Sequence, residues 1–270
     1  MTGSGKREAG SGEQGAGGDR FSDGLHRTVR SGDGTCTAYS VEYGEHYHST
    51  RDGALTESLR KHVEPAFSCF DDTSPLRILD ICFGLGFNTL ATLHYLREKG
   101  MRRRIEIVSP ELDEGLVRSL GAFEYPEVFI PFRSVIESLA AHGVYEDESV
   151  RVEVRFADAR KLLPALETPF DIVYQDAFSP EHNPALWTRE YFAELARLTH
   201  ENSVVTTYST ALRTRLALYE NGFNVYLNRG EGYRNATVAC KNVLENFEPV
   251  DMAHKIGCNP DVKSLRDDEV

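Results

Sequence analysis

The chain has 270 residues and a formal net charge of −12, with 40% hydrophobic and 27% charged residues. This composition is that of a globular protein, long enough for one domain with a full core and short appendages. No apolar run approaches the ~18 residues that cross a bilayer, and no signal-peptide pattern is visible. The five cysteines are scattered without a Cys-x-x-Cys pair, which argues against a metal site and favours a reducing cytoplasm. The negative charge excludes binding to nucleic acid through a generally basic surface, so any RNA substrate requires a local basic patch.

The ends of the chain differ in composition from its middle. Residues 1–24 begin with a stretch rich in Gly, Ser and charge that cannot offset its ordering entropy by burial, so we predict a disordered tail. Residues 25–70 are predicted to form an N-terminal extension, with a hairpin over 35–49 and a helix over 54–67 that stops near Pro65. Residues 71–245 form the main domain, and residues 246–270 are predicted to be a polar tail.

The main domain contains seven strand candidates, at 76–81, 103–108, 150–156, 170–175, 203–208, 223–228 and 236–241. Helical patterns separate the first six, and this alternation predicts a mostly parallel sheet with helices on both faces. Only the last two are joined by a short loop, so we expect an antiparallel hairpin at one edge. This order is typical of the Rossmann-like α/β fold of class I methyltransferases.

A glycine-rich turn follows the first of these strands, in the run ICFGLG (81–86) after Asp80. Gly84 and Gly86 lack a Cβ and let the backbone approach a ligand. A dinucleotide fingerprint counted from Gly84 needs Gly or Ala at position 89, where Thr89 stands. An acidic residue followed by small-x-Gly-x-Gly is instead the methyltransferase form, with Cys82 in place of the usual first glycine. A plain tight turn is the alternative.

Carboxylates also follow the next two strands. Glu111 can accept hydrogen bonds from both ribose hydroxyls of an adenosine, although Asp113 is a nearby alternative and either suits the first turn of a helix. Asp158 can accept from an adenine amino group while Ala159 donates its backbone N–H, and Asp158 suits an N-cap equally well. Ligands bind at the carboxyl edge of such sheets, and an acidic edge suits the sulfonium of S-adenosyl-L-methionine. The sequence therefore predicts this cofactor and no metal.

Asp176 follows the fourth strand within DIVYQDAFSPEHNPALWT (171–188), where a methyltransferase places the group that meets the substrate nucleophile. An unshifted aspartate, with a pKa of ~3.9 against ~10.4 for an alkylamine, is a poor base. Orienting the amine and stabilising its developing positive charge is the better role. Phe178 can face that cation or stack on a base. Trp187 is either a core anchor or part of the site, and His182 is either a loop residue or a general base.

The run DAFSPEHNPALW (176–187) resembles the Asp-x-Phe-x-Pro-x-x-Asn-Pro-x-x-Trp signature of the methyltransferase domain of MnmC-type tRNA 5-(aminomethyl)-2-thiouridine enzymes and their stand-alone relatives. Residues 47–58, the run FGLGFNTL (83–90) with Asn88, and residues 221–240 resemble further segments of that family in the same order. The resemblance covers about residues 40–242 and includes no flavin-dependent oxidase domain.

This resemblance implies an S-adenosyl-L-methionine-dependent enzyme acting on the tRNA anticodon stem-loop. The acceptor is the aminomethyl group of the wobble uridine, which becomes methylaminomethyl. A stand-alone methyltransferase acts only on an amine already free of carboxymethyl, so an upstream enzyme must supply the precursor. No obligate protein partner and no membrane contact are inferred.

A basic patch for RNA is expected at the same edge of the sheet. Arg213 and Arg215 begin the helix after the fifth strand, and Arg229, Tyr233 and Arg234 lie in the turn of the last hairpin. Together they form a basic and aromatic rim suited to an anticodon loop, with ordinary surface arginines as the alternative. The basic run at 101–106 enters the second strand and is expected at the opposite edge.

Two other functions remain open from the sequence. A methyltransferase of the same fold that acts on a small free amine would agree with the acidic charge. A non-enzymatic module could bind S-adenosyl-L-methionine or a nucleotide without transferring a group.

Overall fold

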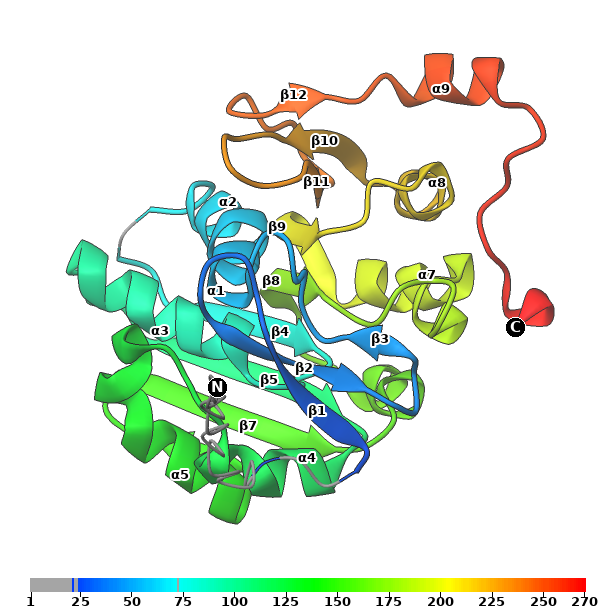
Figure 1. Cartoon of the computed structure of the whole chain (residues 1–270). Coiled ribbons are helices and arrows are strands. Elements are labelled where there is room, and N and C mark those ends of the chain that lie inside the picture. The colour runs from blue at the N-terminus through cyan, green and yellow to red at the C-terminus, as the bar shows by residue number, and fades with distance from the viewer. Residues whose placement is uncertain (1–20, 22–23, 72) are drawn as a thin grey trace, which may run out of the picture.

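A nine-stranded sheet in the order β12-β10-β11-β9-β8-β4-β5-β7-β6 runs through the molecule (Figure 1). The computed structural model describes residues 21, 24–71 and 73–270, so most of the predicted tail of residues 1–24 lies outside the described residues. The strands of this sheet are β4 (Leu76–Ile81), β5 (Ile105–Glu111), β6 (Val144–Glu146), β7 (Val150–Phe156), β8 (Phe170–Gln175), β9 (Thr199–Thr207), β10 (Asn224–Asn228), β11 (Ala236–Cys240) and β12 (Glu248–Pro249).

The strand pairing confirms the predicted architecture. Strands β7, β5, β4, β8 and β9 are parallel, whereas β11 runs antiparallel between β9 and β10. All seven predicted strands are present, and the short strands β6 and β12 extend the two edges. The basic run at 101–106 leads into the start of β5, at the amino edge as expected.

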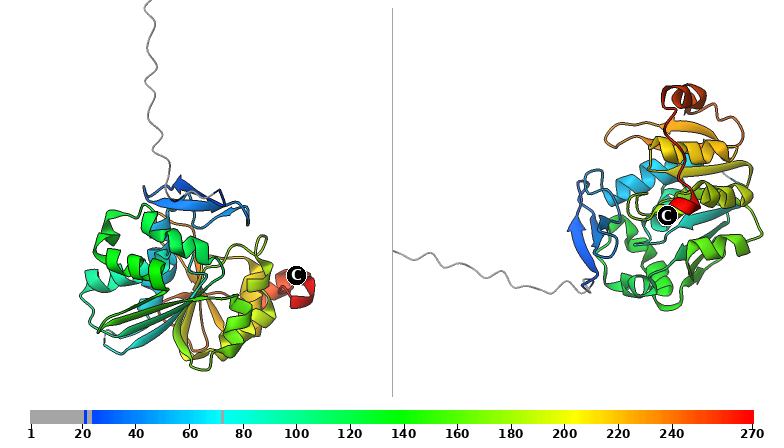
Figure 2. Two further views of the ribbon diagram at one scale, coloured as in Figure 1. Left: turned by 90° about the horizontal axis from the view of Figure 1, so that it is seen from below. Right: turned by 90° about the vertical axis from the view of Figure 1, so that its right-hand side faces the viewer.

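Helices cover both faces of the sheet because the strands are apolar on both sides (Figure 2). In β4, Leu76 and Ile78 pack into one core, while Leu79 and Ile81 pack into the other. The first face is covered by α3 (Phe87–Lys99), α4 (Glu114–Ser119) and α5 (Arg133–His142), and the second by α6 (Ala159–Leu162), α7 (Arg189–Arg197) and α8 (Leu212–Glu220). Short 3₁₀ helices are η2 (Leu120–Ala122), η3 (Glu127–Phe132), η4 (Leu163–Ala165), η5 (Pro184–Leu186) and η6 (Asp267–Glu269).

The N-terminal extension forms a second, three-stranded sheet followed by a helix. Antiparallel strands β1 (His26–Arg30), β2 (Cys36–Ser40) and β3 (Glu45–His46) form this small sheet, in which β2 and β3 are the predicted hairpin and β1 is additional. It lies as a separate layer beside the main sheet (Figure 2). The predicted helix over 54–67 is continuous but contains a π-helical segment: α1 (Ala54–Glu57), η1 (Ser58–Val63) and α2 (Glu64–Phe67).

The C-terminal residues 246–270, described from sequence as a polar tail, make specific contacts with the domain. They include β12, which pairs with β10, and α9 (Met252–Cys258). Leu265 then forms a β-bridge with Thr188, and both Met252 and Ser264 are buried. Across the described parts of the chain, no helix is both long and apolar enough to cross a membrane.

Candidate active site

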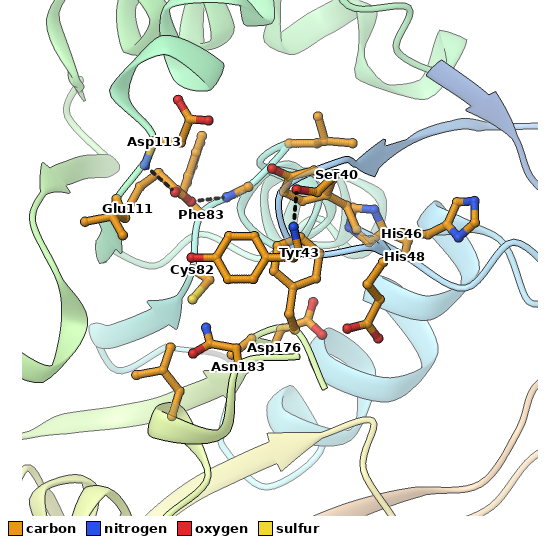
Figure 3. Close-up of a pocket in the computed structure, with 18 of the residues that line it drawn as sticks. Ser40, Tyr43, His46, His48, Cys82, Phe83, Glu111, Asp113, Asp176 and Asn183 are labelled. Carbon is orange, nitrogen blue, oxygen red and sulfur yellow. Dashed lines mark hydrogen bonds between the residues drawn. The ribbon is translucent and has the colours of Figure 1, made fainter. Parts of the chain in front are cut away.

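A cavity of about 840 Å³ opens at the carboxyl ends of the parallel strands (Figure 3). The segments after β4, β5, β7 and β8 contribute Cys82, Glu111, Asp158 and Asp176 to its wall. The opposite wall comes from the small N-terminal sheet and the segment after it, residues 40–51. One chamber therefore joins the glycine-rich turn to the aspartate after β8.

The turn after β4 is built from residues in the left-handed backbone region. Gly84 and Gly86 have φ angles of 54° and 73°, and Cys82 has a φ of 65°, which is the only positive φ of a described non-glycine residue. A Cβ on Gly84 would lie 3.0 Å from the ring of Tyr47. Cys82 thus adopts the conformation that a glycine would take, and it lines the cavity together with Gly84. Gly86 packs instead against the ring of Phe83.

Glu111 links the turn after β4 to the turn after β5. Its Oε2 accepts a 2.7 Å hydrogen bond from the backbone N–H of Gly84, and its Oε1 accepts a 2.8 Å bond from that of Asp113. Burial raises the pKa of Glu111 above its usual range. Asp113, the alternative from sequence, caps α4 by accepting from the N–H of Leu116. The geometry therefore favours Glu111 as the carboxylate that faces a bound nucleoside.

Asp158 is an N-cap, one of the two roles considered for it, and it also lines the cavity. Its carboxylate accepts from the N–H of Arg160 as the N-cap of α6, and both Asp158 and Ala159 line the cavity. The N-cap and the cavity wall are therefore the same residue.

Asp80 is turned into the protein and does not line the cavity. It accepts hydrogen bonds from the hydroxyl of Thr89 (2.8 Å) and the amide of Asn88 (3.4 Å). Burial, together with the nearby charge of Asp176, raises the pKa of Asp80 to about 7. Asn88 does line the cavity and donates a 2.8 Å bond to Oδ2 of Asp176. Asp80 therefore acts on the site through Asn88 and Thr89, not by contact with a ligand.

Asp176 lies at the end of β8 with its side chain only 8% exposed. Burial alone would raise its pKa, but the nearby His62 and His48 and the amide of Asn88 outweigh burial and hold the pKa at about 2. Nε2 of His62 lies 3.3 Å from Oδ1. Asp176 is therefore an ionised carboxylate inside a largely enclosed site.

The segment after Asp176 is fixed from several sides. Phe178 stacks on Tyr43, with ring centroids 4.6 Å apart, and also contacts Tyr47. The indole N–H of buried Trp187 donates a 2.7 Å bond to the carbonyl of Phe178, which agrees with its interpretation as an anchor. The hydroxyl of Tyr208 donates to the carbonyl of Ala177. These bonds leave an aromatic wall beside the carboxylate.

One of the five predicted RNA-contacting residues lines the cavity. Arg234 lies at its rim, bonded to Asp52 and to the hydroxyl of Ser49. Arg51, which the sequence did not single out, also lines the cavity, is exposed, and makes no side-chain hydrogen bond or ion pair within the described part of the chain.

The other four lie elsewhere. Arg215 is 9% exposed and donates to Thr237, because α8 turns this position toward the sheet, so it is not available on the surface. The remaining three are held by local contacts: Arg213 donates to the carbonyl of Lys263, Arg229 pairs with Glu248, and Tyr233 bonds to Asn228 within the hairpin. His182 is exposed next to Gly44 in the β2–β3 turn, outside the cavity wall. Within the described ranges, no cluster of three His, Cys, Asp or Glu side chains is placed to hold a metal ion.

The sheet order and the cavity at its carboxyl edge define a class I methyltransferase. Residues 132–242 match a family model described as S-adenosyl-L-methionine-dependent methyltransferase. The crystal structure of MnmC2 from Aquifex aeolicus is similar, with a TM-score of 0.77 and 32% identity, over 90% of this chain and 79% of that one. The chain belongs to the MnmC2 family of S-adenosyl-L-methionine-dependent methyltransferases.

Curated relatives agree with this placement. An uncharacterized protein of Methanocaldococcus jannaschii is 31% identical over 83% of this chain and 61% of its own length. The tRNA 5-methylaminomethyl-2-thiouridine biosynthesis bifunctional protein MnmC of Azoarcus sp. is 33% identical over 73% of this chain. The match spans 32% of that protein, so the chain covers about a third of the bifunctional relative.

Proposed function

We propose that the chain methylates the aminomethyl group of the wobble uridine in tRNA, converting 5-aminomethyl-(2-thio)uridine to 5-methylaminomethyl-(2-thio)uridine. The observation that carries this proposal is the single chamber that joins Glu111 and the glycine-rich turn to the ionised carboxylate of Asp176. A methyl donor at one end and an amine at the other would meet inside it. The bifunctional relatives are named for biosynthesis of the same modified nucleoside, which supports the choice of acceptor.

The residues present fit S-adenosyl-L-methionine. Left-handed Cys82 and Gly84 let the backbone approach the ligand, Glu111 offers its carboxylate to ribose hydroxyls, and Asp158 and Ala159 lie where an adenine would bind. When bound, the cofactor supplies an electrophilic methyl group on a cationic sulfur.

Asp176 orients the amine and does not act as its base. Proton transfer from an alkylammonium, with a pKa of ~10.4, to an ordinary aspartate, with a pKa of ~3.9, would cost roughly 9 kcal/mol, and the lowered pKa of Asp176 adds to this cost. The carboxylate instead accepts an N–H bond from the neutral amine and stabilises the positive charge that develops on nitrogen as the N–C bond forms. The methylated ammonium then loses its proton to water. Phe178 presents an aromatic surface beside this charge.

The small N-terminal sheet offers features that suit a single-stranded RNA loop. Arg27, Tyr39 and His46 are direct cross-strand neighbours on β1, β2 and β3, and the rings of Tyr39 and His46 are 5.0 Å apart. His46 reaches the cavity wall, and exposed Arg51 lies on the same rim. Aromatic rings stack on unpaired bases and arginines contact phosphates, so this row supports an RNA substrate despite the net charge of −12.

A small free amine is the second candidate acceptor. The acidic cavity wall, which includes Glu42, Glu45 and Glu57, favours a compact cation without a phosphate backbone. Either acceptor must arrive as a free primary amine, so for tRNA an upstream enzyme would supply the aminomethyl precursor.

Nucleoside mass spectrometry separates the two candidates. Undermodified tRNA carrying aminomethyluridine is incubated with the protein and S-adenosyl-L-methionine, in parallel with a panel of small primary amines. Methylaminomethyluridine in digested tRNA is expected. If the small amines are methylated and the tRNA nucleoside does not gain the mass of one CH₂ group (about 14), the tRNA substrate is rejected.

A further inference from the structure

His62 is a fully buried histidine that bridges the main sheet and the Asp176 carboxylate. Its Nδ1 lies 3.0 Å from the hydroxyl of Thr206 on β9, and its Nε2 lies 3.3 Å from Oδ1 of Asp176. Within the described residues Nε2 makes no contact that meets hydrogen-bond geometry, so its approach to Oδ1 is an ion-pair contact. Because Nδ1 is bonded to the Thr206 hydroxyl, Nε2 is the ring nitrogen that faces the Asp176 carboxylate.

The helix segment that carries His62 is π-helical. Segment η1 (Ser58–Val63) interrupts the helix between α1 and α2. π-Helical turns are rare in proteins, and those that do occur are often found at functional sites. Its neighbour Lys61 is also buried, with Nζ 2.7 Å from both Asp52 and Glu57. The ion pairs of Lys61 anchor this helix segment, and the bond to Thr206 holds the His62 ring, so both fix the position of His62 relative to Asp176.

The two oxygens of Asp176 are held by different elements. Asn88 at the start of α3 donates to Oδ2 at 2.8 Å, and His62 faces Oδ1. We propose that His62 is a positioning residue for methyl transfer: together with Asn88, it fixes the plane of the Asp176 carboxylate so that its free lone pairs face the acceptor amine. This inference rests on the proposed function, since it assumes an amine acceptor.

The same contact favours the ionised form of Asp176. The other titratable groups around the pair are Asp80, which Asn88 contacts, Tyr174, whose ring packs against His62, and His48, Tyr208 and Cys82 on the cavity wall. Burial raises the pKa of Asp176, and His62 is the first group that opposes it. Loss of His62 therefore moves the pKa of Asp176 upward, and activity that needs the carboxylate is lost at a higher pH as the solution is acidified.

The test compares His62→Gln, which keeps an N–H donor near the Nε2 position, with His62→Leu, which removes it. We expect kcat of His62→Leu to fall by about 10- to 100-fold, the scale of a hydrogen bond to a charged group, with little change in affinity for S-adenosyl-L-methionine. The acid limb of kcat should move to higher pH in the order wild type, His62→Gln, His62→Leu. His94→Gln, a half-buried histidine on α3 beside Phe129, is the matched control and should retain the wild-type profile.

Circular dichroism and calorimetric binding of S-adenosyl-L-methionine establish that each variant is folded. A folded His62→Leu protein with wild-type kcat and an unmoved acid limb overturns the inference. If that variant does not fold, the comparison of His62→Gln with wild type decides in the same way. If the wild-type protein methylates no aminomethyl tRNA, the proposed function fails separately. In that case a ¹³C NMR titration of Asp176 still decides on the contact, because an unchanged titration in His62→Gln overturns it.

Discussion

Replacing Asp80 by asparagine should remove a pH dependence of stability that the wild-type protein shows between about pH 4 and pH 7. Burial raises the pKa of Asp80 from its ordinary value of 3.8 to about 7. The folded state then holds a proton that the unfolded chain has already released. The contribution of Asp80 to stability is therefore fully present below pH 4 and is lost as the pH rises through this range.

The size of the effect follows from the two pKa values. At roughly 1.36 kcal/mol per pH unit, the interval from 3.8 to about 7 corresponds to about 4 kcal/mol of unfolding free energy. About 2.5 kcal/mol of this falls between pH 5 and pH 8. Asp176 does not contribute here: its lowered pKa stabilises the fold above pH 4, and that stability is lost only as the pH falls toward 2.

Urea unfolding of wild type and Asp80→Asn at pH 5 and pH 8 measures this directly. The free energy of unfolding of the variant minus that of wild type should be larger, in the stabilising direction, at pH 8 than at pH 5 by about 2.5 kcal/mol. Glu167→Gln, which changes an exposed carboxylate before β8, should show no such difference. Equal differences at the two pH values for Asp80→Asn would refute the assignment of a buried, protonated Asp80.

Three further substitutions test the site. Asp176→Ala should lower kcat by at least ~10²-fold, the scale of removing an electrostatic stabiliser, with unchanged cofactor affinity by calorimetry; wild-type turnover would remove Asp176 from the mechanism. Glu111→Gln should weaken S-adenosyl-L-methionine binding by at least ~10-fold, since charged hydrogen bonds to ribose are lost, and equal affinity would reject that contact. Arg51→Ala should reduce the slope of log affinity for tRNA against log salt by about 0.7 to 0.9, whereas Arg102→Ala at the opposite edge should not; equal slopes would place the RNA elsewhere.

The sheet was predictable because its strands are buried apolar runs. β4, β7 and β8 begin and end where the sequence pattern places them. β9 begins at Thr199, four residues before the prediction, because Thr199 pairs with Phe170, and a register irregularity separates this pair from the apolar run that pairs from Val204 onward. β6 and β12 have three and two residues, too few to show any periodicity. Strand pairing at these edges depends on tertiary contact and not on local sequence.

The cofactor side of the site was predictable for a similar reason, since each residue directly follows a recognisable strand. The acceptor side was not. Tyr43 and Tyr47 reach Phe178 only because the small sheet docks over the cavity, and no local pattern indicates that docking. The burial of Arg215 could not be predicted either. The sequence places this residue near the ligand edge, but α8 is buried on most sides by the sheet and the C-terminal segment.

The acidic residues of the site differ in charge because their surroundings differ. Asn88 contacts both Asp80 and Asp176, yet the pKa of Asp80 is raised to about 7, whereas that of Asp176 is held at about 2. The N-terminal extension contributes to the difference: His62 and His48 together outweigh burial at Asp176, whereas at Asp80 His62 also lowers the pKa but burial outweighs it. Two neighbouring carboxyls have pKa values driven apart: Asp80, within the core, holds its proton up to about pH 7, whereas Asp176, on the cavity wall, is charged at neutral pH. The extension therefore contributes to the candidate site, because its histidines oppose the rise in the pKa of Asp176 that burial causes.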